Sequence, residues 1–202
     1  MKLVFTGIQG CGKGTQARIL VENYGFTLVE MGQEFRNLVA SGTELGNTIK
    51  AILDAGEQVN AELGKQIMET VIEKQTAEKI IFDGFIRNDW NKEIFDRVLP
   101  DYTAVFFELS EEKAKQRLLG RMFNQTTGET FPYGTTHDPK TGEELIQRKD
   151  DNEESILKRI EEYTTKTLPI LKLQKEEGKV VEINADQAIE KVADDVKEKL
   201  GL

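Results

Sequence analysis

The sequence has 202 residues, enough for one sizeable hydrophobic core with a small lobe or two attached to it. Its formal net charge of −9 disfavours nucleic acid and anionic membranes as partners, because both would repel the average surface. The single cysteine excludes an intrachain disulfide and a zinc site built from cysteines. No apolar run approaches the length that spans a bilayer, and the N-terminus passes straight into glycines rather than a signal-peptide core. We therefore expect a cytoplasmic protein that binds neither membrane nor nucleic acid.

Short apolar runs alternate with longer amphipathic segments along the chain. The apolar runs predict five strands, at residues 2–6, 27–29, 79–82, 103–107 and 180–183. The amphipathic segments predict helices at about 13–24, 31–41, 44–55, 60–76, 88–98, 111–121, 150–177 and 187–200. Near-continuous apolar strands separated by helices are typical of a parallel sheet that is covered on both faces. The sequence therefore predicts an α/β fold with a five-stranded parallel sheet flanked by helices.

Glycine and proline mark several helix ends. Gly25, Gly42, Gly56 and Gly178 stand where C-terminal caps are expected. Pro169 falls inside the longest helical segment, and we expect it to kink or split that segment.

Residues 122–147 break the alternation of strands and helices. This stretch contains several glycines, prolines and threonines and shows no clear helical or strand period. A loop of this length inside a compact domain is more often a functional lid than a failed helix.

A glycine-rich turn follows the first predicted strand and opens the first predicted helix, at residues 7–15 (G-I-Q-G-C-G-K-G-T). Backbone N–H groups of such a turn converge on phosphate oxygens, and Lys13 adds a positive charge. Gly14 follows the lysine and the hydroxyl comes one position later, at Thr15. This departure from G-x-x-x-x-G-K-[ST] disfavours a GTPase. We expect a phosphate site here.

Asp83 ends the third predicted strand, directly before Gly84. A carboxylate at the C-terminal end of a buried strand beside a phosphate loop is well placed to hold the hydration shell of Mg²⁺.

Phosphoryl transfer depends on positioned cations, so the arginines are candidates: Arg36, Arg87, Arg117, Arg121, Arg148 and Arg159. A single arginine without context is more often simply solvated. The motifs around these arginines therefore matter more than their number.

Four motifs together carry a family resemblance. They are Gly7 to Gln16, the run D-G-F-I-R at 83–87, Gly120-Arg121, and T-G-E-E-L at 141–145 leading to R-K-D-D-N-E at 148–153. In this order they resemble the adenylate kinases, P-loop nucleoside monophosphate kinases, over essentially the whole chain. The resemblance implies a core domain at 1–29, 60–120 and 149–202, a monophosphate-binding lobe at 30–59 and a mobile lid at 121–148.

The resemblance also implies an activity and the residues that perform it. The implied reaction is Mg²⁺-dependent, reversible phosphoryl transfer, ATP + AMP = 2 ADP, by a monomer. The implied catalytic residues are Lys13, Arg87, Arg121, Arg148 and Arg159. The implied ATP-binding residues are Gly10, Cys11, Gly12, Lys13, Gly14, Thr15, Arg117 and Arg121. The implied monophosphate-binding residues are Met31, Gly32, Arg36, Gly84, Arg87, Asn91, Arg148 and Arg159. Asp150 and Asp151 would orient lid arginines.

The lid offers one further expectation from the resemblance. Some relatives tie their lid with four cysteines around zinc, which this chain lacks. Asn124, Thr127, Asp138 and Thr141 look like the polar hydrogen-bonded network that replaces zinc in other members. His137 beside Asp138 is weak support for a metal, so we expect no structural zinc.

Three positions depart from the adenylate kinase pattern, and all bear on the acceptor base. Met31 stands where a threonine is usual, Ile86 replaces a proline, and Asn91 replaces the glutamine that pairs with adenine. The segment R-N-D-W-N at 87–91 looks instead like that of the UMP/CMP kinases. Those enzymes have short lids, whereas this chain has a long one, so we favour AMP.

Two other readings stay open. A nucleotide-binding sensor without turnover would not need Lys13 and the arginine set, which disfavours it. A P-loop ATPase would release phosphate without an acceptor.

Overall fold

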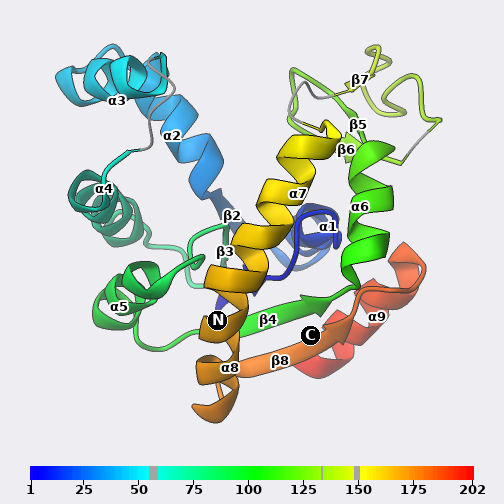
Figure 1. Ribbon diagram of the computed structural model, residues 1–202. Helices are drawn as coiled ribbons and strands as arrows, with labels where there is room; N and C mark the ends of the chain where they lie inside the picture. Colours follow the sequence, from blue (N-terminus) through cyan, green and yellow to red (C-terminus); the bar gives the residue numbers. More distant parts are fainter. Residues whose placement is uncertain (55–58, 133, 148–150) are drawn as a thin grey trace.

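The computed structural model describes residues 1–54, 59–132, 134–147 and 151–202, and its centre is a twisted parallel sheet (Figure 1). The strands are β1 (Lys2–Thr6), β2 (Thr27–Glu30), β3 (Ile80–Asp83), β4 (Thr103–Glu108) and β8 (Val180–Asn184). They pair in the order β2-β3-β1-β4-β8, and every neighbouring pair is parallel. Leu3 on the central strand lies opposite Ile81 on one side and Thr103 on the other. The predicted fold class is confirmed.

Helices cover both faces of this sheet. Their bounds are α1 (Lys13–Tyr24), α2 (Met31–Ala40), α3 (Glu44–Asp54), α4 (Ala61–Glu73), α5 (Asp89–Val98), α6 (Glu111–Leu119), α7 (Glu153–Glu162), α8 (Leu168–Glu176) and α9 (Ile189–Leu200).

Alternation along β1 produces two hydrophobic cores. Leu3 and Phe5 face a core that includes buried residues of α1, α6, α7 and α9. Val4 faces the opposite core, which includes buried residues of α3, α4, α5 and α8. Because both faces of the strand are buried, its sequence reads as a continuous apolar run.

The strand order places a crevice at the carboxyl edge of the sheet. In the sheet, β3 and β2 lie on one side of β1, and β4 and β8 lie on the other. Parallel sheets bind ligands where the order reverses in this way, outside the carboxyl ends of the strands. Thr6, Glu30 and Asp83 end their strands at this edge.

Two extensions rise from the same side of the sheet (Figure 1). One is formed by α2 and α3. The other is a small antiparallel sheet of β5 (Met122–Phe123), β6 (Thr130–Phe131) and β7 (Ile146–Gln147), in the order β6-β5-β7. The sequence showed no strand period here, since two-residue strands are too short to produce one.

The long helical segment predicted at 150–177 is split. α7 ends at Glu162, a π-helical turn labelled η1 spans Tyr163–Thr167, and α8 follows with Pro169 in its first turn. The α-helical hydrogen bonding is thus interrupted just before Pro169, where the sequence predicted a kink or a split, while the helical path itself continues. The expected cap at Gly56 lies outside the described residues.

Within the described ranges, no helix combines the length and the apolar character that a membrane span requires.

A polar network joins α5 to the residues that directly precede β4 and β8. The Asp96 carboxylate accepts hydrogen bonds from Lys92 Nζ at 2.5 Å, Tyr102 OH at 2.9 Å and Lys179 Nζ at 3.1 Å. Partial burial raises the pKa of Asp96, but these three donors outweigh it and hold the pKa below its usual range.

We predict that Asp96→Asn flattens the acid dependence of the free energy of unfolding. The pKa of Asp96 is lower in the folded than in the unfolded chain, so its contribution is present above about pH 4 and is lost as the pH falls further. Urea unfolding at a series of pH values measures this slope. Exposed Asp101→Asn is the matched control. Equal slopes for Asp96→Asn and the wild type would contradict the prediction.

Candidate active cleft

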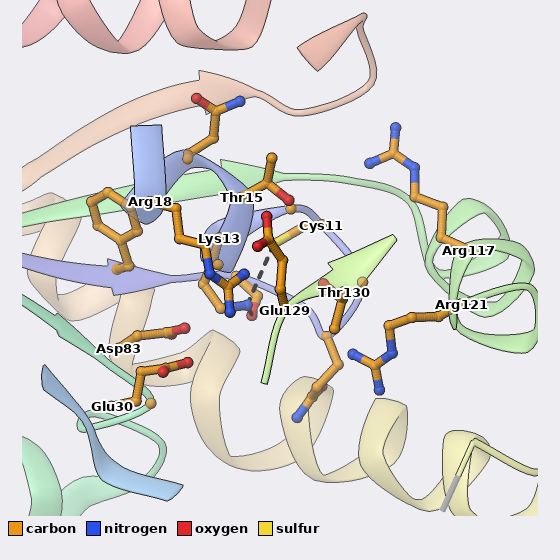
Figure 2. A pocket seen from close by; sticks show the side chains of 18 of the residues that line it. Cys11, Lys13, Thr15, Arg18, Glu30, Asp83, Arg117, Arg121, Glu129 and Thr130 are labelled. Atoms are coloured by element: carbon orange, nitrogen blue, oxygen red, sulfur yellow. Dashed lines mark hydrogen bonds between the residues drawn. The ribbon is translucent and has the colours of Figure 1, made fainter. Parts of the chain in front are cut away.

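A cavity of about 1600 Å³ opens at the carboxyl edge of the sheet. Its wall includes the loop after β1, the ends of β2 and β3, the start of α2, the end of α6 and the β5–β6 hairpin. Figure 2 shows Lys13, Asp83 and Glu30 on one side, Arg117 and Arg121 on the other, and Glu129 and Thr130 reaching between them. Side chains from the core and from both extensions therefore converge on one space.

The loop between β1 and α1 needs glycine for two different reasons. Gly12 has φ +96°, a left-handed conformation that other residues adopt only with strain. Gly7 has φ +139° and is also crowded, because a Cβ there would lie 2.6 Å from the carbonyl oxygen of Phe107 on β4. Glycine at these two positions therefore lets the loop follow its tight path at the edge of the cavity.

Lys13 points back into its own loop. Its Nζ donates to the carbonyl oxygens of Gly7 at 2.7 Å and Ile8 at 3.1 Å, and lies 3.4 Å from Cys11 Sγ. These contacts hold the ammonium beside the helix start, where phosphate oxygens would need it. Cys11 is 2% exposed and serves as a small packed residue of the loop.

The N-terminus of α1 differs from those of the helices nearby. Asn60, Asn88, Ser110 and Asn152 each accept a backbone N–H at the start of α4, α5, α6 and α7. At α1 no described side chain caps the helix, and its first turn carries no acidic residue. Because its N–H groups face the cavity wall formed by residues 12–15, they are suited to bind an anion.

Two carboxylates lie side by side at the ends of neighbouring strands. Glu30 on β2 is opposite Asp83 on β3, and both line the cavity (Figure 2). Burial and the charge of Asp83 raise the pKa of Glu30, against the lowering effect of Arg18 and Arg36. Paired oxygen donors of this kind fit a hydrated Mg²⁺ ion. Sequence reasoning missed Glu30, although its place one residue beyond an apolar run was a usable signal.

Arg36 is oriented by a neutral side chain. Its Nε and Nη2 both donate to Gln33 Oε1, at 3.1 Å and 2.8 Å, and Gln33 in turn donates to Asn37 at 2.8 Å. Because its partner is an amide, the charge of the guanidinium is not neutralised within this pair. Arg87 lies in the same wall, with its guanidinium packed over Gly84, where a Cβ would come within 2.7 Å of Nη2.

Asp151 holds two predicted arginines together. Its buried carboxylate accepts from Arg121 Nε at 2.8 Å and Nη2 at 2.6 Å, and from Arg159 Nη1 at 3.2 Å. Arg121 lines the cavity, and the expected orienting role of Asp151 agrees with these contacts. Arg117 also lines the cavity and donates to the carbonyl of Ala185 at 3.1 Å. Arg148 and Asp150 lie outside the described residues.

A second, smaller hollow of about 390 Å³ adjoins the cleft. It is lined by Phe35, Val39 and Ala40, with Gly32 and Arg36 shared with the main cavity. A flat apolar group attached to an anion would fit this arrangement, since the anion could reach Arg36 while the group packs on Phe35.

The predicted lid segment, described at 121–132 and 134–147, contains a compact polar cluster. Asn124 Nδ2 donates to Asp138 Oδ2 at 2.7 Å and to Thr141 Oγ1 at 3.3 Å, and both Asn124 and Asp138 are buried. Thr127 is attached through its backbone N–H, which donates to Asn124 Oδ1 at 3.0 Å. Burial raises the pKa of Asp138, but hydrogen bonds from Lys140, Asn124 and Thr141 outweigh it and lower the pKa. In the part of the chain that the structure describes, no group of three His, Cys, Asp or Glu side chains could hold a metal ion.

One flank of α1 contacts the lid at two points. Arg18 Nη2 donates to the carbonyl oxygen of Gly128 at 3.1 Å, and Glu22, one turn further on, pairs with Lys140 Nζ at 2.7 Å. These contacts join residues more than a hundred positions apart and place the β5–β6 hairpin over the phosphate loop. Sequence reasoning missed Arg18, although its spacing of three from Thr15 puts it near the same face of the helix.

The described residues that line the cavity include most of the predicted set: Gly10, Cys11, Gly12, Lys13, Gly14, Thr15, Gly32, Arg36, Asp83, Gly84, Arg87, Arg117 and Arg121. Met31, Asn91 and Arg159 are not in that wall. Met31 packs against the core beside α4 and α5, and Asn91 is buried on α5. The wall also contains residues that the sequence did not single out, among them Gln9, Arg18, Glu30, Gln33, Glu129 and Tyr163.

Comparison with known proteins agrees with this geometry. A sequence model of the family described as adenylate kinase matches residues 5–179. The chain is 32% identical to an adenylate kinase of Fusobacterium nucleatum, over all of this chain and 99% of that protein. It is 33% identical to one of Alkaliphilus oremlandii, with coverage of 100% and 99%, and 34% identical to one of Bacillus subtilis, with coverage of 100% and 98%.

The fold and cleft define a P-loop phosphotransferase of the nucleoside monophosphate kinase type. The chain belongs to the adenylate kinase family.

We predict that reversing the charges of Glu22 and Lys140 together preserves the docking of the lid on α1. Glu22→Lys or Lys140→Glu alone places like charges opposite each other, so backbone amides of residues 124–129 should exchange hydrogen faster, by roughly a factor of two for an exposed pair. The double reversal should return exchange to the wild-type rate, and added salt should reduce the effect of each single change. If the double variant exchanged as fast as either single variant, this pair would not hold the lid.

Proposed function

We propose that this chain is an adenylate kinase that transfers a phosphoryl group reversibly from ATP to AMP, with Mg²⁺, to give two ADP. One observation carries the proposal: the glycine loop with Lys13, the Asp83 carboxylate, and Arg36 and Arg87 all line a single cavity. Full-length similarity to proteins named adenylate kinase supports the same activity. A cytoplasmic monomer stays a prediction of the sequence.

The phosphoryl donor, ATP, would bind with its phosphates at the phosphate loop. We assign the phosphates of ATP to the N–H groups of residues 10–15 and to Lys13, whose ammonium lies at the loop. Lys13 would exchange its hydrogen bonds to Gly7 and Ile8 for the transferring phosphate, where charge spreads over the equatorial oxygens. Arg117, beside the chain after β8, would lie against the base. Arg121 would reach the polyphosphate from the other wall.

We assign the metal to the carboxylate pair. Asp83 would hold the hydration shell of the ion, and Glu30 lies close enough to share it. When bound, Mg²⁺ neutralises charge on the phosphate oxygens. The lid cluster of Asn124, Asp138 and Thr141 would fix the lid by hydrogen bonds, and a lid without zinc stays a prediction.

The phosphoryl acceptor, the nucleoside monophosphate, would bind between α2 and the β3–α5 turn. Arg36 and Arg87 would clamp the phosphate of the monophosphate, with Gly32 and Gly84 allowing close approach. The hollow beside Phe35 and Val39 is suited to the attached base. Met31 and Arg148 stay predicted members of this site.

Closure would complete the site and remove water. The α2–α3 lobe and the lid would each fold over one nucleotide, so the arginines gather only when both are bound. Asp151 would keep Arg121 and Arg159 together during this movement. Water exclusion matters because water would otherwise accept the phosphoryl group. No covalent intermediate is needed, since one phosphate attacks the other in line.

We predict that Lys13→Met lowers turnover at least about a hundredfold while the fold survives, because a positioned charge on the transferring group is lost. Steady-state kinetics in both directions measure turnover, and circular dichroism monitors the fold. Lys172→Met on the exposed side of α8 is the control and should leave turnover unchanged. A near-normal rate for Lys13→Met would place the reaction elsewhere.

The acceptor is tested by comparing AMP, CMP and UMP in a coupled assay at fixed MgATP. We expect AMP to be preferred, and nothing in the fold, the cleft or the relatives favours the UMP/CMP alternative. A clear preference for CMP or UMP would refute the proposal. Binding of ATP without turnover on any monophosphate would instead indicate a sensor, and phosphate release without an acceptor would indicate an ATPase.

A further inference from the structure

The backbone of Arg87 is held on both sides by buried side chains. Its N–H donates to Asn91 Oδ1 at 3.1 Å, and its carbonyl oxygen accepts from Thr167 Oγ1 at 3.0 Å. Asn91 is 7% exposed and Thr167 is 9% exposed, so water competes little for either hydrogen bond. Asn91 lies four positions after Arg87 in the sequence, whereas Thr167 lies eighty positions after it.

The amide of Asn91 is already used inside the protein. Its oxygen must face Arg87, because a backbone N–H can only donate. Its Nδ2 faces Met68 Sδ at 3.7 Å, a weak acceptor on α4. The N–H of Asn91 itself is capped by Asn88 Oδ1 at 3.0 Å, which fixes the residue in the first turn of α5. Asn91 is not among the residues that line the cavity, and both ends of its amide have partners inside the protein.

Thr167 is the last residue of η1, where the helix is wider than an α-helix. In η1 the N–H of Leu168 bonds to the carbonyl of Tyr163, five residues earlier, so one extra residue is inserted into the helix. One residue turns the direction of a helical side chain by about 100°. Pro169, which cannot donate to a carbonyl one turn back, makes an uninterrupted α-helix unfavourable here. The wide turn thus directs the Thr167 hydroxyl toward the β3–α5 turn.

We infer that Asn91 and Thr167 are positioning residues for Arg87, and that Asn91 does not read the acceptor base. This inference rests on the proposed function and assigns a different role to Asn91 from the base-pairing one that the sequence suggested. The guanidinium packs over Gly84, so a fixed backbone also fixes where the charge meets the acceptor phosphate. Displacement of a catalytic group by about 1 Å can cost roughly a hundredfold in rate.

The first experiment compares Thr167→Val with Thr167→Ser. Valine keeps the size and removes the hydroxyl, whereas serine keeps the hydroxyl. We expect kcat/KM for AMP to fall about tenfold or more in Thr167→Val, the KM for ATP to stay within about twofold, and Thr167→Ser to recover most of the loss. Equal AMP kinetics for the two variants, or an equal loss toward ATP and AMP, would overturn the inference. Thermal unfolding of both variants shows whether the fold is retained.

The second experiment measures kcat/KM for AMP and for CMP in Asn91→Leu and Asn91→Asp. If Asn91 positions Arg87, both substrates lose activity together and their ratio changes by less than about twofold, because the reacting phosphate is common to both. If Asn91 hydrogen-bonds the base, the ratio changes by orders of magnitude, roughly up to 10⁴, which would overturn the inference. Wild-type turnover of AMP, measured alongside, tests the proposed function separately from both comparisons.

Discussion

The hydrogen bonds from the Lys13 ammonium to two carbonyl oxygens of its own loop fix the point around which the cleft is organised. Those carbonyls stay in place because Gly7 packs directly on the backbone of β4 and Gly12 adopts a left-handed conformation at the start of α1. The sheet fixes the loop, the loop fixes the charge, and the neighbouring strands bring Glu30 and Asp83 to the same edge. The chemistry of the cleft therefore depends on packing inside the sheet.

An excess of negative charge makes the arrangement of cations more demanding. The chain carries a formal charge of −9, so its average surface repels nucleotides. The cleft counters this with Lys13 and arginines drawn from several elements. Each arginine is oriented differently: Arg36 by the neutral amide of Gln33, Arg121 by the carboxylate of Asp151, and Arg117 by a backbone carbonyl. Of these three arginines, Arg121 is thus the one whose hydrogen-bond partner carries a negative charge.

The sequence predicted the fold well because its signals are local. The five strands of the parallel sheet correspond to apolar runs in the sequence. Pro169 indicated that the longest helical segment would be interrupted. The three strands of the lid could not be predicted, since two residues show no period. The π turn before Pro169 was also missed, because no residue type is specific for a five-residue turn.

Prediction of the cleft followed the same division. The glycine loop, Asp83 and the motif arginines were identified because a local pattern marks each of them. Glu30 and Arg18 were not, since each becomes relevant only through a neighbour on another element. The direction of the Asn91 amide depends on Arg87 and Met68 together, and no local pattern encodes such an arrangement.

The contact of α1 with the lid has a consequence for how sequences in this family can diverge. Arg18 needs only a backbone carbonyl at residue 128, which every amino acid supplies, whereas Glu22 needs an opposite charge at position 140. Positions 22 and 140 should therefore change sign together between species that keep this docking, while residue 128 is constrained by its φ of +72°, which favours glycine, and not by the side chain of Arg18. A change of charge at position 140 would then be accompanied by the opposite change at position 22 on α1, 118 positions earlier in the chain.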